Sequence, residues 1–547
     1  MSIKKVTAIL QSRLATIDWK LLIFLLLFLN VKLVVKVVAV ILIYALRRNF
    51  KFGFKIKNTR LPLFYLIIIG IGLFNWMCSG LLANTSYTVA IVTGIFFWLL
   101  CILAIHQVKL SVEKNDPTII HHTILLFFII NIIASLAVYG SIICETGSIN
   151  PYRYQGNFQK YFIGTGDYIK GITLDTSTTN AVINAFGVIY FLLRNKNLWA
   201  LLCMVILVLT GSNITNLLIG ITLLYIFVFQ STKTQKSIIV ICLLCIAVFL
   251  SKISPQNNNY ITTSYEKIVN PKYKENITSG KIIPVKDRPD SILNEEEKKQ
   301  KIAYLYLDSV HAALKAKLNT AALSRPLVAK GIYLKEKPII PKDNIHSAPF
   351  QHKYDTTVFQ ANLLTFIKED KVEEPAIAIK KNNLPGKLIA LIQTADYFQL
   401  HPFKIITGCG MGMFSSKLAF RITALKIAGG YPAKFAFINN DFKNNNLAVY
   451  LDYFTKNAGF HSLINTPNST YNQLVSEYGI VGLAAFLFFY LGFFFRHLKK
   501  ISYGLPILLI MSGFFFTEYW FEQLSVVVLF ELLLLLNIKE NEKAVSQ

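Results

Sequence analysis

Long apolar runs constrain this sequence more than any other feature. Hydrophobic residues make up 54% of the 547 positions and charged residues only 16%, whereas a soluble domain carries about 25% charge. An α-helix needs about 20 mostly apolar residues to cross a bilayer, and four nearly uncharged runs approach or exceed that length, namely 61–82, 87–107, 118–143 and 479–495. The sequence therefore predicts an all-α polytopic membrane protein, and it excludes disordered, collagen-like and disulfide-scaffold chains.

Shorter apolar runs predict further spans at 177–193, 198–210, 214–229, 237–250, 501–516 and 524–538. The run 21–46 is long enough for one helix or for two short ones. Both of its flanks are basic, and cytoplasmic loops collect Lys and Arg. A single crossing would place one basic cluster outside, so we expect a hairpin and about twelve spans in all.

This arrangement predicts how the chain is divided. Residues 1–252 are expected to form an N-terminal transmembrane region of about nine spans, residues 253–478 a large domain on the outer side, and residues 479–547 a C-terminal region of about three spans. The basic flanks predict that both termini lie in the cytoplasm. A cleaved signal peptide is not expected, because no small-residue cleavage site follows the first apolar run.

The net charge of +26 has two sources. Cytoplasmic flanks account for one part, and the outer domain, which is itself basic, accounts for the other. Residues 290–318 and 384–400 predict helices in this domain, so we expect it to be mainly helical. The positive-inside rule loses force for long loops, so the surplus of the outer domain needs a partner or another reason. Nucleic acid is not needed to explain the charge.

Two segments near the end of the outer domain carry the strongest motifs, PFKIITGCGMGMF at 402–414 and TPNSTYNQLVSEYGIVGL at 466–483. Together with many spans and one large outer loop before the last helices, they resemble the bacterial O-antigen ligase and polymerase superfamily. The ending formed by Glu477, Gly479 and Gly482 is the most specific part. Motif-level similarity is confined to about residues 384–487 and, more weakly, 207–221.

The resemblance implies a GT-C-like fold and a glycosyltransferase activity. Such an enzyme moves a saccharide from a polyprenyl-diphosphate carrier to a hydroxyl on a saccharide or lipid-linked acceptor, during assembly of O-antigen, capsule or exopolysaccharide. That reaction needs a base near the acceptor hydroxyl and cations beside the leaving diphosphate. It requires neither a metal nor another cofactor.

The sequence departs from the family pattern at three positions. Asn468 stands where the family has its catalytic His, Asn213 where it has an Arg after Gly-Ser, and Lys387 where it has a loop Arg. Relocated chemistry and a protein that binds without reacting are both open readings of these changes.

Candidate site residues follow from the motifs and from chemistry. For catalysis we consider Asn468, which could orient a hydroxyl or simply be a turn residue after Pro467. The other two are His461, a nearby imidazole that could also be an ordinary surface His, and Glu477, a base or a helix-orienting group. The cations that suit a diphosphate are Lys387, Arg421, Arg153 and Lys170, each of which could equally be a solvated surface charge. The glycines Gly408, Gly410, Gly412, Gly479 and Gly482 predict a tight turn or a close backbone approach.

Glu531 lies in the middle of the last apolar run, where an ionisable group is costly and usually faces a partner in the helix bundle. One interpretation of Glu531 is a protonated carboxyl group bonded to a neighbouring helix. The other is a polar lining or proton site, and this interpretation, together with the twelve spans, keeps a transporter or lipid-carrier flippase open as an alternative function. A non-catalytic scaffold of a polysaccharide assembly complex is the third reading, suggested by Asn468 and Asn213.

Overall fold

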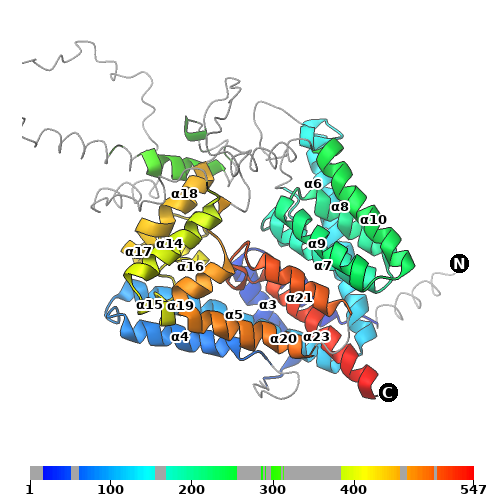
Figure 1. The fold of residues 1–547 in the computed structure, drawn as a ribbon, viewed down its shortest axis with the longest axis horizontal. Helices are drawn as coiled ribbons and strands as arrows, with labels where there is room; N and C mark the ends of the chain where they lie inside the picture. The colour runs from blue at the N-terminus through cyan, green and yellow to red at the C-terminus, as the bar shows by residue number, and fades with distance from the viewer. Residues whose placement is uncertain are drawn as a thin grey trace, which may run out of the picture.

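The computed structural model describes residues 16–50, 61–153, 168–254, 285–287, 290, 293, 297–308, 312, 384–455, 465–497 and 502–546. Within these ranges every regular element is a helix and none is a strand (Figure 1). The helices pack around one large hydrophobic core, and a smaller core lies under the helices of the outer domain. The all-α prediction is confirmed for the described part of the chain.

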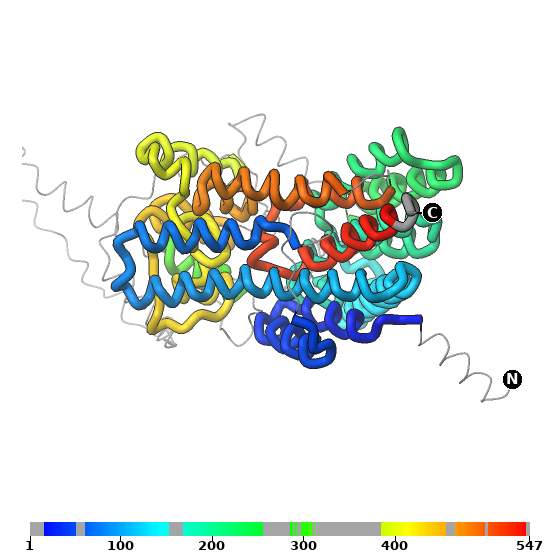
Figure 2. Tube along the Cα trace, turned by 90° about the horizontal axis from the view of Figure 1, so that it is seen from below, coloured from blue at the N-terminus to red at the C-terminus, as the bar shows by residue number. Residues whose placement is uncertain are grey.

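Four of the described helical segments are long and apolar enough to cross a membrane: α5 (Thr85–Lys114), α6 (Pro117–Thr146), α10 with its π-helical end η4 (Lys233–Ile253), and the continuous segment Thr470–His497. That last segment comprises α19 (Thr470–Phe486), η12 (Leu487–Leu491) and α20 (Gly492–His497). The structure is thus compatible with a helical membrane protein. In Figure 2, the blue, light-blue and orange tubes of α4, α5 and α19 run alongside one another.

The remaining apolar helices are shorter than a full crossing and occupy positions predicted from the sequence. They are α2 (Trp19–Phe28), α4 (Phe64–Cys78), α7 (Ser177–Leu193), α8 (Asn197–Leu209), α9 (Asn213–Phe229) and α21 (Gly504–Phe514). At about 1.5 Å per residue, none of them reaches the roughly 30 Å of a hydrocarbon core.

The run 21–46 folds as two helices, as predicted. Helix α2 ends at Phe28, and α3 (Leu33–Arg47) packs back against it. At the tip between them, the Val31 N–H donates to the carbonyl of Thr173 over 2.8 Å. Lys36 on α3 donates to the carbonyl of Phe28 over 2.7 Å and to the Ser525 hydroxyl over 2.8 Å. These bonds fix the hairpin tip beside residues 168–178 and the start of the last helix.

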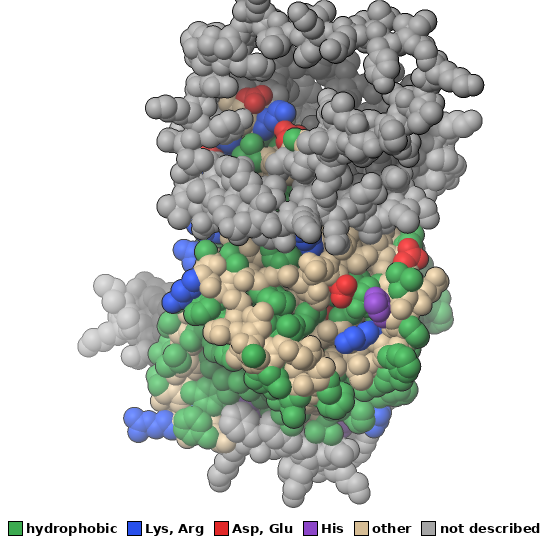
Figure 3. All heavy atoms as spheres, turned by 90° about the vertical axis from the view of Figure 1, so that its left-hand side faces the viewer, with side chains coloured by type: hydrophobic (Ala, Val, Ile, Leu, Met, Phe, Trp, Pro, Cys, Tyr) green, Lys and Arg blue, Asp and Glu red, His purple; other side chains and the backbone are tan. Residues whose placement is uncertain are grey.

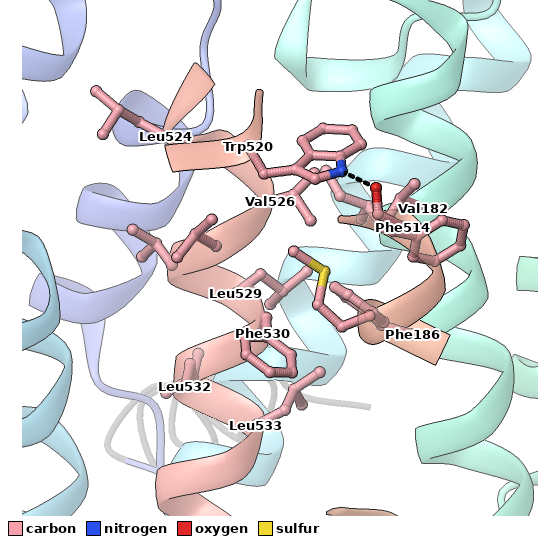
Figure 4. Packing of buried hydrophobic residues seen from close by; sticks show 14 of the residues in the cluster. Val182, Phe186, Phe514, Trp520, Leu524, Val526, Leu529, Phe530, Leu532 and Leu533 are labelled. Atoms are coloured by element: carbon pink, nitrogen blue, oxygen red, sulfur yellow. Dashed lines mark hydrogen bonds between the residues drawn. The ribbon is translucent and has the colours of Figure 1, made fainter. Parts of the chain in front are cut away.

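Helix α23 (Ser525–Ser546) forms the centre of the bundle. Residues 526–536 are buried on all sides of the helix, as expected of a helix surrounded by other helices. Figure 4 shows Phe530 and Leu529 packed toward Phe186 of α7. In the preceding turn, the Trp520 indole N–H donates to the Phe514 carbonyl over 2.6 Å. This packing holds residues 515–524 in one conformation.

The outer-domain helices α14 (Gly386–Leu400), α16 (Lys417–Ile422), α17 (Asn440–Phe442) and α18 (Ala448–Thr455) lie above α4, α5 and α19 in Figure 1. Their small core includes Phe420, Phe442, Tyr450 and Phe454. It also takes in Tyr519, from the connection between α21 and the short α22 (Trp520–Gln523). This part of the chain, predicted to be the outer domain, is therefore packed directly onto the last helices. Residues 384–400 were correctly predicted as a helix, whereas much of 290–318 lies outside the described residues.

The surface agrees with a membrane setting. On the face shown in Figure 3, hydrophobic and neutral atoms cover most of the described surface, and charged side chains are few. Many large apolar side chains of the short and long helices are exposed, including Val34, Phe74, Val92, Val228 and Phe488. Exposed apolar side chains in such numbers indicate contact with lipid rather than with water.

Candidate functional site

A cavity of about 550 Å³ lies where the helix bundle meets the outer domain. One wall comes from the hairpin tip, residues 168–178 and Gln523, and the other from residues 417–430, helix α18 and residues 466–468 and 518–519. These segments are far apart in the sequence, and the sequence predicts all of them on one side of the membrane. The cavity is therefore the best candidate for a binding site in the described part of the chain.

Lysines dominate the charge of this cavity. Four lysines line it, Lys170, Lys299, Lys417 and Lys426, against two carboxylates, Asp175 and Glu518. Lys170, predicted as a donor contact, lies over the Tyr168 ring at 5.6 Å. Neither Lys170 nor Lys417 forms an ion pair with any residue that the structure describes. A cavity of this composition attracts anions.

Asn468, predicted as a catalytic residue, lies in the cavity wall beside Glu518. Its side-chain amide donates to Glu518 Oε2 over 2.9 Å. Its own Oδ1 is buried and has no hydrogen-bond partner among the described residues. Leaving such an atom unsatisfied costs about 1–3 kcal/mol. The Asn468 side chain therefore acts through its N–H donor, and this donor fixes one oxygen of the Glu518 carboxylate.

Lys387 lies just behind this pair and is 3% exposed. Its ammonium donates to the Thr466 hydroxyl over 3.1 Å, to the Thr517 carbonyl over 2.8 Å, and to the Asn468 carbonyl. An ammonium has three donors, and each has an acceptor here. Burial lowers the pKa of Lys387, which the nearby Glu518 carboxylate opposes. Lys387 does not line the cavity, and a bound diphosphate would have to replace one of these bonds.

Glu477 and the glycine-rich segment contact each other directly. The Glu477 carboxylate accepts the N–H of Gly412 over 2.9 Å and the N–H of Phe414 over 3.2 Å. Two backbone bonds, from Cys409 to Ser476 and from Gly410 to Glu477, join the same segments over 2.8 and 3.0 Å. Glu477 is fully buried and does not line the cavity. Its contacts are those of the helix-orienting alternative.

Two glycines permit this close approach. Gly408 has φ +80° and Gly479 has φ +69°. A Cβ on Gly408 would lie 2.3 Å from the Glu477 carbonyl carbon, and a Cβ on Gly479 would lie 2.1 Å from the Ile406 carbonyl oxygen. Gly410 and Gly412 also have positive φ, whereas Gly482 is a buried helical residue of α19. The two motifs are thus brought together, with a structural role beside the cavity.

Arg421 supports the cavity wall without lining it. Its guanidinium lies 5.4 Å from the centre of the Phe97 ring, and its Nε donates to the Gly430 carbonyl over 3.3 Å. Gly430 and the adjoining Gly429 line the cavity. Arg421 therefore connects this loop to α5.

Two predicted intramembrane polar residues lie away from the cavity. Glu531 accepts bonds through Oε1 from the hydroxyls of Tyr490, over 2.9 Å, and of Tyr65. This is the predicted alternative of a carboxyl group held by neighbouring helices. Asn213 is the first residue of α9 and follows Ser212, the N-cap. Neither residue lines the cavity.

Two other predicted residues cannot be placed at the site. His461 lies outside the described residues, and Arg153 ends the short helix η1 (Pro151–Arg153), with its side chain outside the description.

Sequence reasoning missed several cavity residues, namely Asp175, Lys299, Lys417, Lys426, Glu518 and Gln523. A signal was present for Glu518, since two glutamates stand in the short segment between the last two apolar runs.

A second carboxylate holds the segment that carries Lys417. Glu522 accepts the N–H of Leu418 over 2.8 Å and the side-chain amide of Gln473 over 2.7 Å. The hydroxyl of Ser415 bonds to that of Tyr519 over 3.0 Å. Helix α16 is thereby tied to α19 and α22, with Lys417 at its start.

No protein-family model, curated protein or solved structure matches this chain significantly. Within the described residues, no group of three or more His, Cys, Asp or Glu side chains is placed to hold a metal ion.

The backbone around Gly408 lies so close to the backbone around Gly479 that adding one methyl group should strongly destabilise the protein. We expect Gly479→Ala to destabilise the protein by about 3 kcal/mol or more, because it adds an unfavourable φ to a backbone collision. Gly70→Ala is the matched control, since a Cβ there meets nothing within 4 Å. Thermal unfolding in mild detergent would measure both. Equal midpoints for the two variants would contradict the packing.

Lys387 predicts a second stability effect. Lys387→Ala leaves three buried oxygens without their donor, at about 1–3 kcal/mol for each unsatisfied group. We expect a loss of about 3 kcal/mol or more, seen as a lowered unfolding midpoint. Lys404→Ala, at an exposed lysine of the same domain, should change stability by less than about 0.5 kcal/mol. A Lys387→Ala variant as stable as this control would show that the three hydrogen bonds of Lys387 do not contribute to stability.

Proposed function

We propose that this protein is a glycan ligase or polymerase of the bacterial inner membrane. It would transfer a saccharide from a polyprenyl-diphosphate carrier to a hydroxyl acceptor during assembly of a surface polysaccharide. In this proposal the short helices complete a GT-C-like arrangement of about twelve spans. Both termini are cytoplasmic and the outer domain is periplasmic.

The observation that carries the proposal is the lysine-lined cavity beside the Asn468 segment. Lys170 and Lys417, without ion pairs among the described residues, are available to an anionic ligand. A departing diphosphate gains negative charge as its bond to the sugar breaks, and fixed cations stabilise that charge best where water is largely excluded. The cavity thus has the electrostatics that the transfer needs.

The cavity wall formed by residues 417–430 and helix α18 suits a saccharide. Phe420 and Tyr450 stack at 3.8 Å between ring centres, and Phe454 lies 5.1 Å from Tyr450. All three line the cavity with several hydroxyl side chains. Apolar faces with a few polar groups are typical of small-molecule sites, and about 550 Å³ lies within their usual range.

The location of the cavity also fits a lipid-linked donor. Its walls include the hairpin tip and the ends of helices from the bundle, as well as the outer domain. A carrier lipid in the bilayer could therefore present its diphosphate here while its tail remains in the membrane.

Donor conversion by purified protein tests the proposal. Protein in lipid nanodiscs, given a polyprenyl-diphosphate-linked oligosaccharide and a saccharide acceptor, should produce a lengthened or transferred glycan on chromatography. Lys170→Ala and Lys417→Ala should each raise the KM for donor about tenfold, because a charged hydrogen bond contributes about 1.5–3 kcal/mol.

Lys404→Ala, outside the cavity, is the control and should leave the KM unchanged. Unchanged donor in every acceptor mixture would overturn the proposal. Binding of donor by wild-type protein without any conversion would identify a scaffold instead.

A further inference from the structure

We propose that Glu518 is the catalytic base of this cavity and that Asn468 and Lys387 are its positioning residues. The inference rests on the proposed glycan transfer and assigns its proton-accepting group. Glu518 lies between α21 and α22, outside both sequence motifs.

The two oxygens of the Glu518 carboxylate have different surroundings. Oε2 accepts the bond from the Asn468 side chain over 2.9 Å. Oε1 accepts no hydrogen bond from any residue that the structure describes, and Glu518 is only partly buried because it lines the cavity. One oxygen is thus fixed and the other is available to a hydroxyl in the cavity.

The backbone on both sides of this pair is immobilised. Lys387 binds the carbonyls of Thr517 and Asn468, so a single ammonium holds the two chain segments that carry the carboxylate and the amide. The Thr470 hydroxyl donates to the Glu518 carbonyl over 2.7 Å and accepts the Trp520 N–H over 3.2 Å. A general base needs its position fixed before it needs any particular pKa.

The charges that face Glu518 come from three directions. They are Lys387 on α14, Lys417 at the start of α16, and Asp175 before α7. The two lysines and the Asn468 bond favour the carboxylate, but burial and Asp175 outweigh them and raise the pKa of Glu518 above its ordinary value. A raised pKa makes this carboxylate a stronger proton acceptor than an ordinary one.

Asp175 is the other carboxylate among the described cavity residues, and its Oδ1 likewise accepts no hydrogen bond from a residue that the structure describes, but its other oxygen has two donors instead of one. Its Oδ2 accepts the Thr179 hydroxyl over 3.0 Å and the Gln523 amide over 2.9 Å. These bonds tie the start of α7 to α22. Asp175 therefore joins two segments of one cavity wall through Oδ2, and the experiment below compares it with Glu518.

The proposed step balances as a displacement at the anomeric carbon. The acceptor hydroxyl oxygen forms a bond to that carbon while the bond from the carbon to the diphosphate oxygen breaks. The hydroxyl proton passes to Glu518 Oε1. The diphosphate leaves with the bonding electron pair, and Lys170 and Lys417 stabilise its charge.

The first test is Glu518→Gln in nanodiscs with the donor and acceptor described above. We expect kcat to fall about 10²- to 10⁴-fold, while binding of a polyprenyl diphosphate without saccharide stays within about twofold of wild type. The wild-type rate should rise with pH as Glu518 loses its proton, and this acid limb should be absent from the residual activity of the variant. Asp175→Asn should retain the limb.

The second test uses Asn468→Ala, which leaves the carboxylate in place. The Asn468 bond lowers the pKa of Glu518, so its removal should move the acid limb to higher pH. A purely structural role would lower activity without moving the limb. Asn468→Asp removes the amide donor as well and should shift the limb in the same direction.

The outcomes separate this inference from the function on which it rests. If wild-type protein does not convert donor, the proposed function fails. If wild-type protein converts donor and Glu518→Gln keeps both its rate and its acid limb, the assignment of Glu518 is overturned. Loss of the limb in Asp175→Asn instead would transfer the role of base to Asp175.

Discussion

The hydrogen bonds of the buried Lys387 ammonium are the interaction on which the cavity and the segments around it depend. The ammonium bonds to oxygens from two segments, 466–468 and 517, and it comes from a third, the start of α14. An unpaired buried charge would be costly, so the three segments must stay together for Lys387 to remain satisfied. Gly386 beside it approaches the Asn465 backbone closely enough to exclude any side chain. The contacts of Gly386 and Lys387 therefore determine the position of the cavity wall that contains residues 466–468 and 518–519.

Those parts of the fold that follow from local sequence patterns, such as apolar runs and basic flanks, were predictable from the sequence. Apolar run length predicted the long and short apolar helices of the bundle but not α15 (Lys404–Thr407) to α18 or α22, and the basic flanks of 21–46 predicted its division into α2 and α3. The lengths were less predictable, because only four of the described helical segments are both long and apolar enough to cross a membrane. The length of an apolar run does not determine where tertiary contacts end a helix, as the hairpin tip bonded to Thr173 illustrates.

The candidate site was predictable only in part. Motif reasoning selected the segments that meet, but Glu477, Gly408 and Gly479 join them, while the cavity forms next to them. Lys170 and Asn468 were selected and do line it. Lys417 and Glu518 were not selected, since each stands in a short segment without periodicity, and only tertiary packing brings these segments together. Charge alone could not distinguish Lys417 from the many other lysines of a basic domain.

A comparison with three buried glutamates explains why Glu518 is proposed as the base. Glu477 accepts two backbone N–H groups, one on each oxygen, and Glu522 accepts one backbone and one side-chain donor in the same way. Glu531 is enclosed between two tyrosines in the bundle. All three use their charge or polarity to hold helices and loops in place. Glu518 has one oxygen bonded within the protein and lies at a cavity lined by lysines. A carboxylate held on one side and open on the other is arranged to exchange a proton with a ligand.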